Sequence, residues 1–193
     1  LELLYSIPWD RPIENMDAWM TFASPGGTIL GSLSAGGVLR FCPDGKEPMA
    51  AYMTGQTVGV AVDEKRREIH VCNWSPFLTA LDADTLKPVR WVRIPWTAER
   101  LTIDVESDRL FVACPVSGQV LVVDLQSYEV EKTIYTIPGV RIVSIDKKNR
   151  RLLFAGFTPF MEIRSMDDYT LVNRIACPHW ARWIDLNPDK NEA

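Results

Sequence analysis

The sequence predicts an all-β chain built from repeated units of four short antiparallel strands. The first observation is a repeat, because prolines recur at Pro95, Pro138 and Pro178, at intervals of 43 and 40 residues. Such a period is typical of stacked supersecondary units, and units of four strands repeat about every 40 to 45 residues. The second observation is that runs rich in β-branched residues alternate with charged or Gly/Pro turns. No segment of useful length shows the 3.6-residue period of a helix.

Each unit opens with a hairpin, and a second hairpin follows it. The opening hairpins are V-G-V-A-V-D-E-K-R-R-E-I-H-V-C-N, R-L-T-I-D-V-E-S-D-R-L-F-V-A-C and V-R-I-V-S-I-D-K-K-N-R-R-L-L-F-A-G, from Val58, Arg100 and Val140. Four antiparallel strands per unit are typical of a β-propeller blade. We therefore predict a β-propeller of four-stranded blades over residues 16–55, 56–96, 97–138 and 139–179.

The sequence pattern at each end of the chain indicates part of a further blade. Residues 1–12 contain L-E-L-L-Y-S-I-P, which matches an outermost strand, and residues 180–193 contain W-A-R-W-I-D-L-N-P-D, which matches an innermost strand. We expect one propeller domain over 1–193, with about four complete blades plus partial blades at both ends. The ring would then be completed by missing sequence or by a second chain. In the alternative, one end strand is something else and four blades close alone.

The residue pattern of the repeats resembles that of a known family of proteins. The succession G-V-A-V-D, then I-H-V-C-N or L-F-V-A-C, then V-V-D and a last strand ending in I-P is similar to YVTN and NHL-type β-propeller repeats, most strongly over 56–179. The usual Y-V-T-N strand appears here as H-V-C-N and F-V-A-C, and charge replaces the glycine-rich first turn. The resemblance implies a propeller fold. Such families include lactonases, quinoprotein-like dehydrogenase domains and non-catalytic adaptors, so it selects no function.

Charge, hydrophobic runs and cysteine spacing limit which kinds of partner and cofactor we expect. The net charge is −4, whereas nucleic-acid-binding domains usually carry a basic excess, so we expect no nucleic acid. No apolar run approaches the ~20 residues of a membrane span, and we see no targeting segment. Four scattered cysteines without a C-x-x-C pair and two histidines predict no metal site and no cofactor. Free thiols at Cys72 and Cys114, inside apolar strands, favour an intracellular location.

Aromatic residues gather in one set of connections. In a propeller the turns from the first to second and third to fourth strands lie on one face, and here these turns carry charges of both signs. The second-to-third turns and the interblade links lie on the other face. There we find Trp9, Trp74, Phe77, Trp96, Phe157, Phe160, His179 and Trp180. Large rings of this kind are enriched in binding hot spots. In the alternative, each tryptophan packs on its neighbouring proline and has only a structural role.

Three arginines recur at the entry to the first strands. Arg100, Arg141 and Arg182 are 41 residues apart, and Gly59 holds the matching place in the preceding unit. Their guanidinium groups would lie at the channel mouth, where they could hold a carboxylate, a phosphate or an acidic peptide. The competing interpretation is that each arginine pairs with a nearby acid such as Glu99 or Asp185.

No catalytic signature is present. The chain has no G-x-S-x-G elbow, and the recurring Asp63, Asp104, Asp146 and Asp185 are interpreted as turn residues that bond their own backbone. We therefore hypothesise a non-enzymatic module that binds a protein or peptide, acidic in chemistry, through its aromatic and arginine-bearing face. Two alternatives stay open. One is part of a lactonase-like or quinoprotein-like enzyme whose active site lies in other blades, and the other is a structural subunit of a larger complex.

Overall fold

A computed structural model describes residues 19–22, 29–32, 36–41, 49–177, 180–181 and 184–186. Every regular element in these ranges is a β-strand. The predicted partial blade at 1–12 lies outside the described residues. No helix in these ranges has the length and hydrophobicity of a membrane span.

The strands form four sheets, each made from four strands consecutive in the chain. The first sheet contains β1 (Trp19–Phe22), β2 (Ile29–Ser32), β3 (Gly37–Phe41) and β4 (Met49–Tyr52). The second contains β5 (Thr57–Asp63), β6 (Glu68–Asn73), β7 (Phe77–Asp82) and β8 (Pro88–Arg93). The third contains β9 (Arg100–Asp104), β10 (Arg109–Cys114), β11 (Gln119–Asp124) and β12 (Glu129–Tyr135). The fourth contains β13 (Val140–Asp146), β14 (Arg151–Gly156), β15 (Phe160–Ser165) and β16 (Leu171–Ala176).

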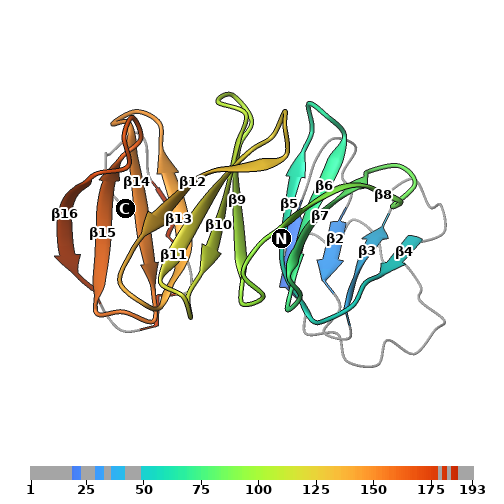
Figure 1. The fold of residues 1–193 in the computed structure, drawn as a ribbon, viewed down its shortest axis with the longest axis horizontal. Coiled ribbons are helices and arrows are strands. Elements are labelled where there is room, and N and C mark those ends of the chain that lie inside the picture. Colours follow the sequence, from blue (N-terminus) through green and yellow to red (C-terminus); the bar gives the residue numbers. More distant parts are fainter. Residues whose placement is uncertain are drawn as a thin grey trace, which may run out of the picture.

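All neighbouring strands within a sheet pair antiparallel, so each sheet is a meander of two hairpins. The leading strands β5, β9 and β13 contact one another in series. Figure 1 shows the four sheets in a row, with the first and the fourth at opposite ends. The predicted all-β chain of four-stranded antiparallel units is confirmed. The four described sheets form an open arc, and do not close on themselves.

The backbone conformation of the turns also repeats from one sheet to the next. The turn after each leading strand ends on a residue with positive φ, at Arg67, Asp108 and Arg150. Asp63 and Asp146 each accept a backbone N–H from three residues later at 3.0 Å. An aspartate that caps its own turn in this way holds the chain in a tight reversal. These two aspartates are thus turn residues, as the sequence indicated.

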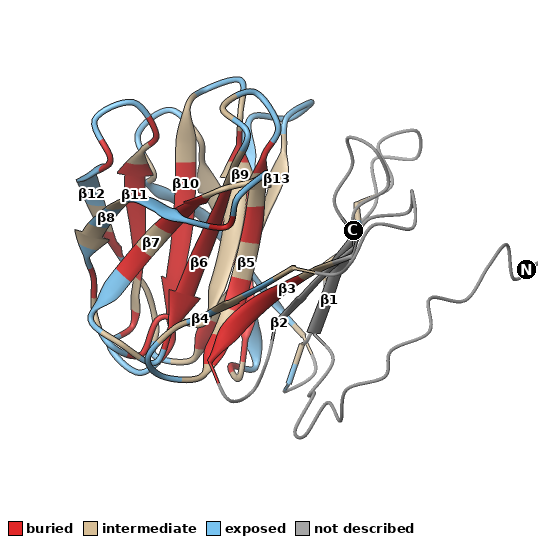
Figure 2. Ribbon diagram, turned by 90° about the vertical axis from the view of Figure 1, so that its right-hand side faces the viewer, coloured by how far each residue is buried: buried red, intermediate tan, exposed pale blue. Residues whose placement is uncertain are grey.

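The core lies between neighbouring sheets. One cluster joins the second and third sheets through residues such as Leu78, Val112 and Leu121. A second joins the third and fourth sheets through Phe111, Phe154 and others. Figure 2 shows buried residues concentrated in the middle strands, with exposed turns at both ends. Burying a side chain such as Phe111 stabilises the fold by about 2 to 3 kcal/mol, so each sheet depends on its neighbours.

The arc continues past the fourth sheet. Thr102 of β9 donates a hydrogen bond from Oγ1 to the Val143 carbonyl of β13 at 2.7 Å. One sheet further on, Ser144 of β13 donates from Oγ to the carbonyl of Ile184 at 3.5 Å. Residues 184–186 therefore lie beside β13 much as β13 lies beside β9. This place is the one expected for the innermost strand of a further blade, although these three residues form no regular strand.

Candidate binding face

The two ends of the sheets carry different chemistry. The turns at 64–67, 105–108 and 147–150 lie together at one end, because Asp108 contacts Lys65 and Arg66, and Lys147 contacts Asp104 and Glu106. We call this end the charged face. The turns at 74–76, 115–118 and 157–159 and the links at 94–99 and 136–139 lie at the opposite end, which we call the aromatic face. The antiparallel topology places them there.

Five of the predicted aromatic residues are exposed on or near the aromatic face. Trp96 in the link after β8 is 64% exposed and Trp180 is 65% exposed, and Trp74, Phe77 and Phe160 are also exposed. Removing so much aromatic surface from water would be favourable, and the fold itself does not do so. Tryptophan and other large rings are enriched in binding hot spots, and a binding role for these residues stays a prediction.

Two ring pairs organise this surface. Phe77 packs edge-on against Trp91 of β8, with the centroids 5.2 Å apart, so Phe77 lies toward the outer edge of the second sheet. Phe157 packs edge-on against Trp180 at 4.7 Å and is itself half-buried. Phe157 thus holds Trp180 in place while Trp180 remains exposed. The packing of Phe157 agrees with the structural interpretation, while a binding role for Trp180 stays a prediction.

The structure adds exposed rings that the sequence analysis missed. Tyr52 ends β4 and Tyr135 ends β12, and both are highly exposed on the aromatic face. Their signal in the sequence was their place at the end of an outermost strand, next to an interblade link. Trp91 was also missed, because it lies in the middle of β8 and strand alternation alone does not show that β8 is uncovered.

Arg141 pairs with a neighbouring acid. Its Nε lies 2.6 Å from Oε2 of Glu99, and both side chains are mostly buried. The Arg141 guanidinium also stacks over the Phe157 ring at 5.1 Å from the centroid. Glu99, Arg141, Phe157 and Trp180 therefore form one connected row from the link before β9 to the end of the fourth sheet. This pairing is the competing interpretation that the sequence left open for Arg141.

A β-bulge displaces Arg141 from the place of Arg100. Arg100 pairs with Ala113 across the first hairpin of its sheet, whereas Ile142 pairs with Ala155 in the next. The register shifts between Val140 and Ile142, so Arg141 is the extra residue. The structure differs here from the expected equivalence of Arg100 and Arg141. The third predicted arginine, Arg182, lies outside the described residues.

Arg100 nevertheless lies close to Arg141. Burial, and then the positive charge of Arg141, lower the pKa of Arg100, while Glu99 partly offsets them. Two guanidinium groups and one carboxylate thus lie close together, and guanidinium donors match the geometry of carboxylates and phosphates. Gly59 holds the corresponding place in the second sheet because a Cβ there would lie 2.6 Å from both Cys72 Sγ and the Glu99 carbonyl oxygen.

The remaining candidates give no catalytic centre. Trp9 and His179 lie outside the described residues. His70 is buried in β6, and its Nδ1 lies 3.2 Å from the hydroxyl of Tyr128. Burial raises the pKa of the Cys114 thiol to about 12 and also raises that of Cys72, so neither is a ready nucleophile. Among the described residues, no group of three or more His, Cys, Asp and Glu side chains could hold a metal ion.

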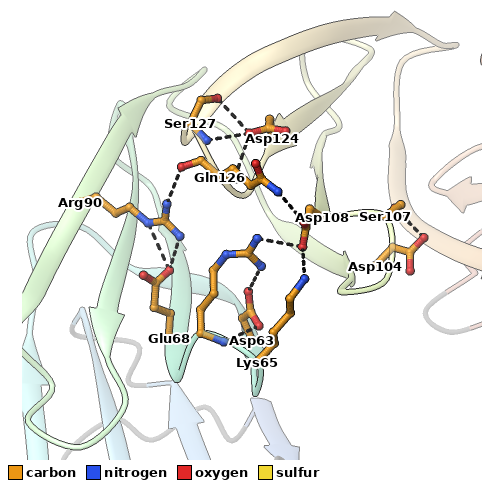
Figure 3. A network of polar contacts seen from close by, with 11 residues as sticks. Asp63, Lys65, Glu68, Arg90, Asp104, Ser107, Asp108, Asp124, Gln126 and Ser127 are labelled. Carbon is orange, nitrogen blue, oxygen red and sulfur yellow. Dashed lines mark hydrogen bonds and ion pairs between the residues drawn. The ribbon is translucent and has the colours of Figure 1, made fainter.

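The charged face is held by ion pairs across the sheets. Figure 3 shows Lys65 reaching Asp108, and Arg90 reaching Glu68 and the backbone of Gln126. Arg66 bridges Asp63 and Asp108 with both distances at 2.8 Å. Hydrogen bonds from Arg66, Gln126 and Lys65 hold the pKa of Asp108 well below its ordinary value. This face therefore joins the second and third sheets.

Comparisons with known proteins define the class of fold. No family model matches the chain, and no curated protein sequence does. Kuenenia stuttgartiensis hydrazine synthase is similar in structure, with a TM-score of 0.74 and 18% identity over 89% of this chain and 53% of that chain. The dihydro-heme d1 dehydrogenase NirN in complex with DHE follows, with a TM-score of 0.69 and 15% identity over 86% of this chain and 39% of that chain.

Both of these proteins contain β-propellers, and the present chain has a β-propeller fold with the four sheets as blades. The chain spans about half of the first matched protein and less of the second. At this identity the likeness shows the fold alone. The comparisons do not identify the YVTN or NHL family, and the similarity to it rests on the residue pattern of the repeats.

Proposed function

We propose that the chain is a binding module that holds an acidic peptide segment of a protein partner on its aromatic face. The observation that carries this proposal is the set of exposed rings at one end of the blades, Trp74, Trp96 and Trp180 above all. Trp180 packs on Phe157, over which the Arg141 guanidinium stacks at 5.1 Å. Aromatic residues and arginine are the side chains most enriched in interface hot spots. A propeller offers such a surface without any catalytic residue.

The acidic character of the partner follows from the charge of the same face. Arg141 pairs with Glu99 at 2.6 Å and Arg100 lies close to both, so two guanidinium groups lie at the entry to the leading strands, and the five N–H donors of a guanidinium can serve more than one carboxylate. A partner carboxylate could approach these guanidinium groups while apolar parts of the peptide cover the tryptophans. A partly buried arginine suits this role, since its charge does not depend on pH in the physiological range.

A selection from a random peptide library displayed on phage tests the proposal. We expect enriched peptides to contain Asp or Glu next to apolar residues. Trp96→Ala and Arg100→Ala should each weaken a selected peptide by about tenfold, which corresponds to about 1.4 kcal/mol. Val89→Ala is the control, because Val89 is exposed on β8 next to its charged-face end, away from the Phe77–Trp91 ring pair.

Two results would contradict the proposal. In the first, selection on this protein enriches no peptide beyond those that selection on an unrelated soluble domain enriches. In the second, peptides bind but Val89→Ala weakens them as much as Trp96→Ala does, which would move the binding surface away from the aromatic face. Melting curves of each variant distinguish lost binding from lost folding.

A second candidate function rests on the comparisons. Both similar structures are enzymes by name, and each is longer than this chain. In this alternative the chain is part of a propeller enzyme whose active site lies in other blades. The enzyme alternative predicts a chromophore or a metal in the intact material, so an absorption spectrum and elemental analysis of the purified protein should then be positive.

A further inference from the structure

The outermost strand of the second blade carries an aromatic pair beside an exposed arginine. Phe77 and Trp91 pack edge-on at 5.2 Å, and they are 40% and 65% exposed. Arg93 lies directly opposite Phe77 across the β7–β8 pair and two residues beyond Trp91. Residues two apart on a strand point to the same face, and residues opposite each other on paired strands are neighbours. Phe77, Trp91 and Arg93 therefore form one patch, which we call the outer triad.

The outer triad points away from the core between the second and third blades. Its neighbours on β8 point toward that core, because Val92 packs on the cluster that joins these blades and the Arg90 guanidinium stacks over Tyr128 at 4.5 Å. Strand alternation then turns Trp91 and Arg93 to the opposite side. Arg93 is exposed and has no ion pair or hydrogen bond with any residue in the described ranges. Its charge is thus available to a partner.

The blade fold forms without these three side chains. The equivalent places hold Gln119, Thr133 and Tyr135 in the third blade and Phe160, Arg174 and Ala176 in the fourth. Arg174, which matches Trp91, is used inside its own blade, where it binds Glu162. Two exposed rings beside an arginine that no described residue pairs are therefore particular to the second of these three blades. Tryptophan and arginine are enriched in interface hot spots, which favours contact with a partner.

The outer edge of β8 is open. β8 is the last strand of its sheet, and no described strand pairs with its other side. An open edge can accept a further strand, whose main-chain hydrogen bonds supply affinity. Pro88 lacks an N–H and a β-bulge follows it at Val89, so the regular part of the edge runs from Arg90 to Arg93. This part of the edge is the one that carries Trp91 and Arg93.

We propose that β8 binds an extended segment of a partner protein by strand addition. An apolar residue of the segment packs on Phe77 and Trp91, and an acidic residue two positions away binds Arg93. Side chains two residues apart on a strand are about 7 Å apart, so the two partner residues match the spacing of Trp91 and Arg93. Aromatic pairs with β-branched residues and pairs of opposite charge both stabilise neighbouring strands. This second surface lies beside the aromatic face and does not depend on Trp96 or Trp180.

Selection from a displayed library tests the proposal. The library is a threonine-rich peptide with two randomised positions that are two residues apart, so both fall on one face of a strand. We expect the wild-type protein to enrich an apolar residue at one position and Asp or Glu at the other. Arg93→Glu should instead enrich Lys or Arg there, because the charge at the edge is reversed. Trp91→Ala should lose the apolar preference and weaken a selected peptide about tenfold.

Two further measurements separate this surface from the aromatic face. Trp96→Ala should leave the affinity of a selected peptide unchanged, and hydrogen exchange followed by NMR should show slower exchange of amides within 90–93 when the peptide binds. The proposal is overturned if the wild-type protein enriches no such pair of residues, or if Arg93→Glu keeps the acidic preference. Unchanged exchange in β8 would overturn strand addition. Loss of binding in Trp96→Ala would assign the selected peptides to the aromatic face instead.

Discussion

At the residue scale, His70 is the most constrained titratable group. It is fully buried in β6, and its Nδ1 bonds the Tyr128 hydroxyl, while Nε2 has no hydrogen-bond partner among the described residues. Burial above all, with smaller effects of Arg90 and Arg66, lowers the pKa of His70 to about 4, although Asp63 opposes them. The Arg90 guanidinium stacks over the ring of Tyr128, 4.5 Å from its centroid. The histidine is therefore neutral in the folded protein.

This buried imidazole predicts a loss of stability in mild acid. The unfolded chain binds a proton at His70 below the ordinary pKa of 6.5, but the folded protein does so only near 4. The free energy of unfolding should therefore decrease by about 3 kcal/mol from this group as the pH falls through that window. Urea unfolding at a series of pH values measures it. His70→Phe, which copies Phe111 at the equivalent position, should remove this contribution, and an unchanged slope would contradict the assignment.

At the element scale, a buried carboxylate in the fourth blade holds an arginine that reaches the third blade. Glu162 of β15 is fully buried and accepts from Arg164 at 2.6 Å and from Arg174 at 2.9 Å. Arg164 also donates to the backbone of Tyr135, across the interface, and stacks on Phe154. A charge buried in this way is stable only while its partners remain.

Removing Glu162 should therefore cost more than removing one arginine. Glu162→Ala leaves Arg164 mostly buried without its carboxylate, and we expect a loss of about 3 to 5 kcal/mol in the free energy of unfolding. Arg174→Ala is the milder control, because Arg174 is about half exposed and Arg164 still binds the acid, so its cost should stay near 1 kcal/mol. Denaturant titrations of the two variants give both values, and equal costs would show that the pair is not the joint between the blades.

Gly59 makes a separate prediction about the close approach of the second and third blades. A methyl group there would lie 2.6 Å from the Glu99 carbonyl oxygen, which is backbone and cannot rotate away. Gly59→Ala should lower the free energy of unfolding by about 1 to 3 kcal/mol, as overpacking does. Ala61→Ser, two residues along the same strand, is a small enlargement for comparison. A neutral Gly59→Ala would mean that the blades are less closely packed than described.

The elements show what the sequence could and could not predict. The blades were predictable because alternation and a period near 41 residues survive every substitution that keeps one face buried. The bulge at Arg141 was not, since one extra residue leaves the apolar pattern of β13 intact while moving a single side chain. A cleft between the third and fourth blades, lined by Ser107, Phe111 and Tyr169 among others, was also missed. Its signal was the exchange of Arg66 for Ser107 at equivalent turns, which has meaning only once neighbouring blades are packed together.

At the scale of the whole molecule, the arc has one uncovered end. All six residues of β16 are exposed, including Leu171, Val172 and Ile175, whereas Ile134 of β12 is buried against the next blade. Ile184 also holds the place of a further leading strand. We expect further blades, from the same or a second chain, to cover this end.

Native mass spectrometry of the purified chain tests the expectation about the arc. A stable dimer or hetero-complex of 21.9 kDa chains, or a larger covalent mass, would fit an arc that needs more blades. A lone folded monomer of 21.9 kDa would contradict it, and a four-blade closed ring would become the better description.

Photo-crosslinking can locate the protein segment that we propose to bind the aromatic face. A selected acidic peptide carrying a photoreactive group is irradiated with the protein, and mass spectrometry locates the linked residues. We expect links to the turns at 74–76, 115–118 and 157–159 and to the link at 94–99. Links gathered instead at the turns 64–67, 105–108 and 147–150, on the charged face, would contradict it.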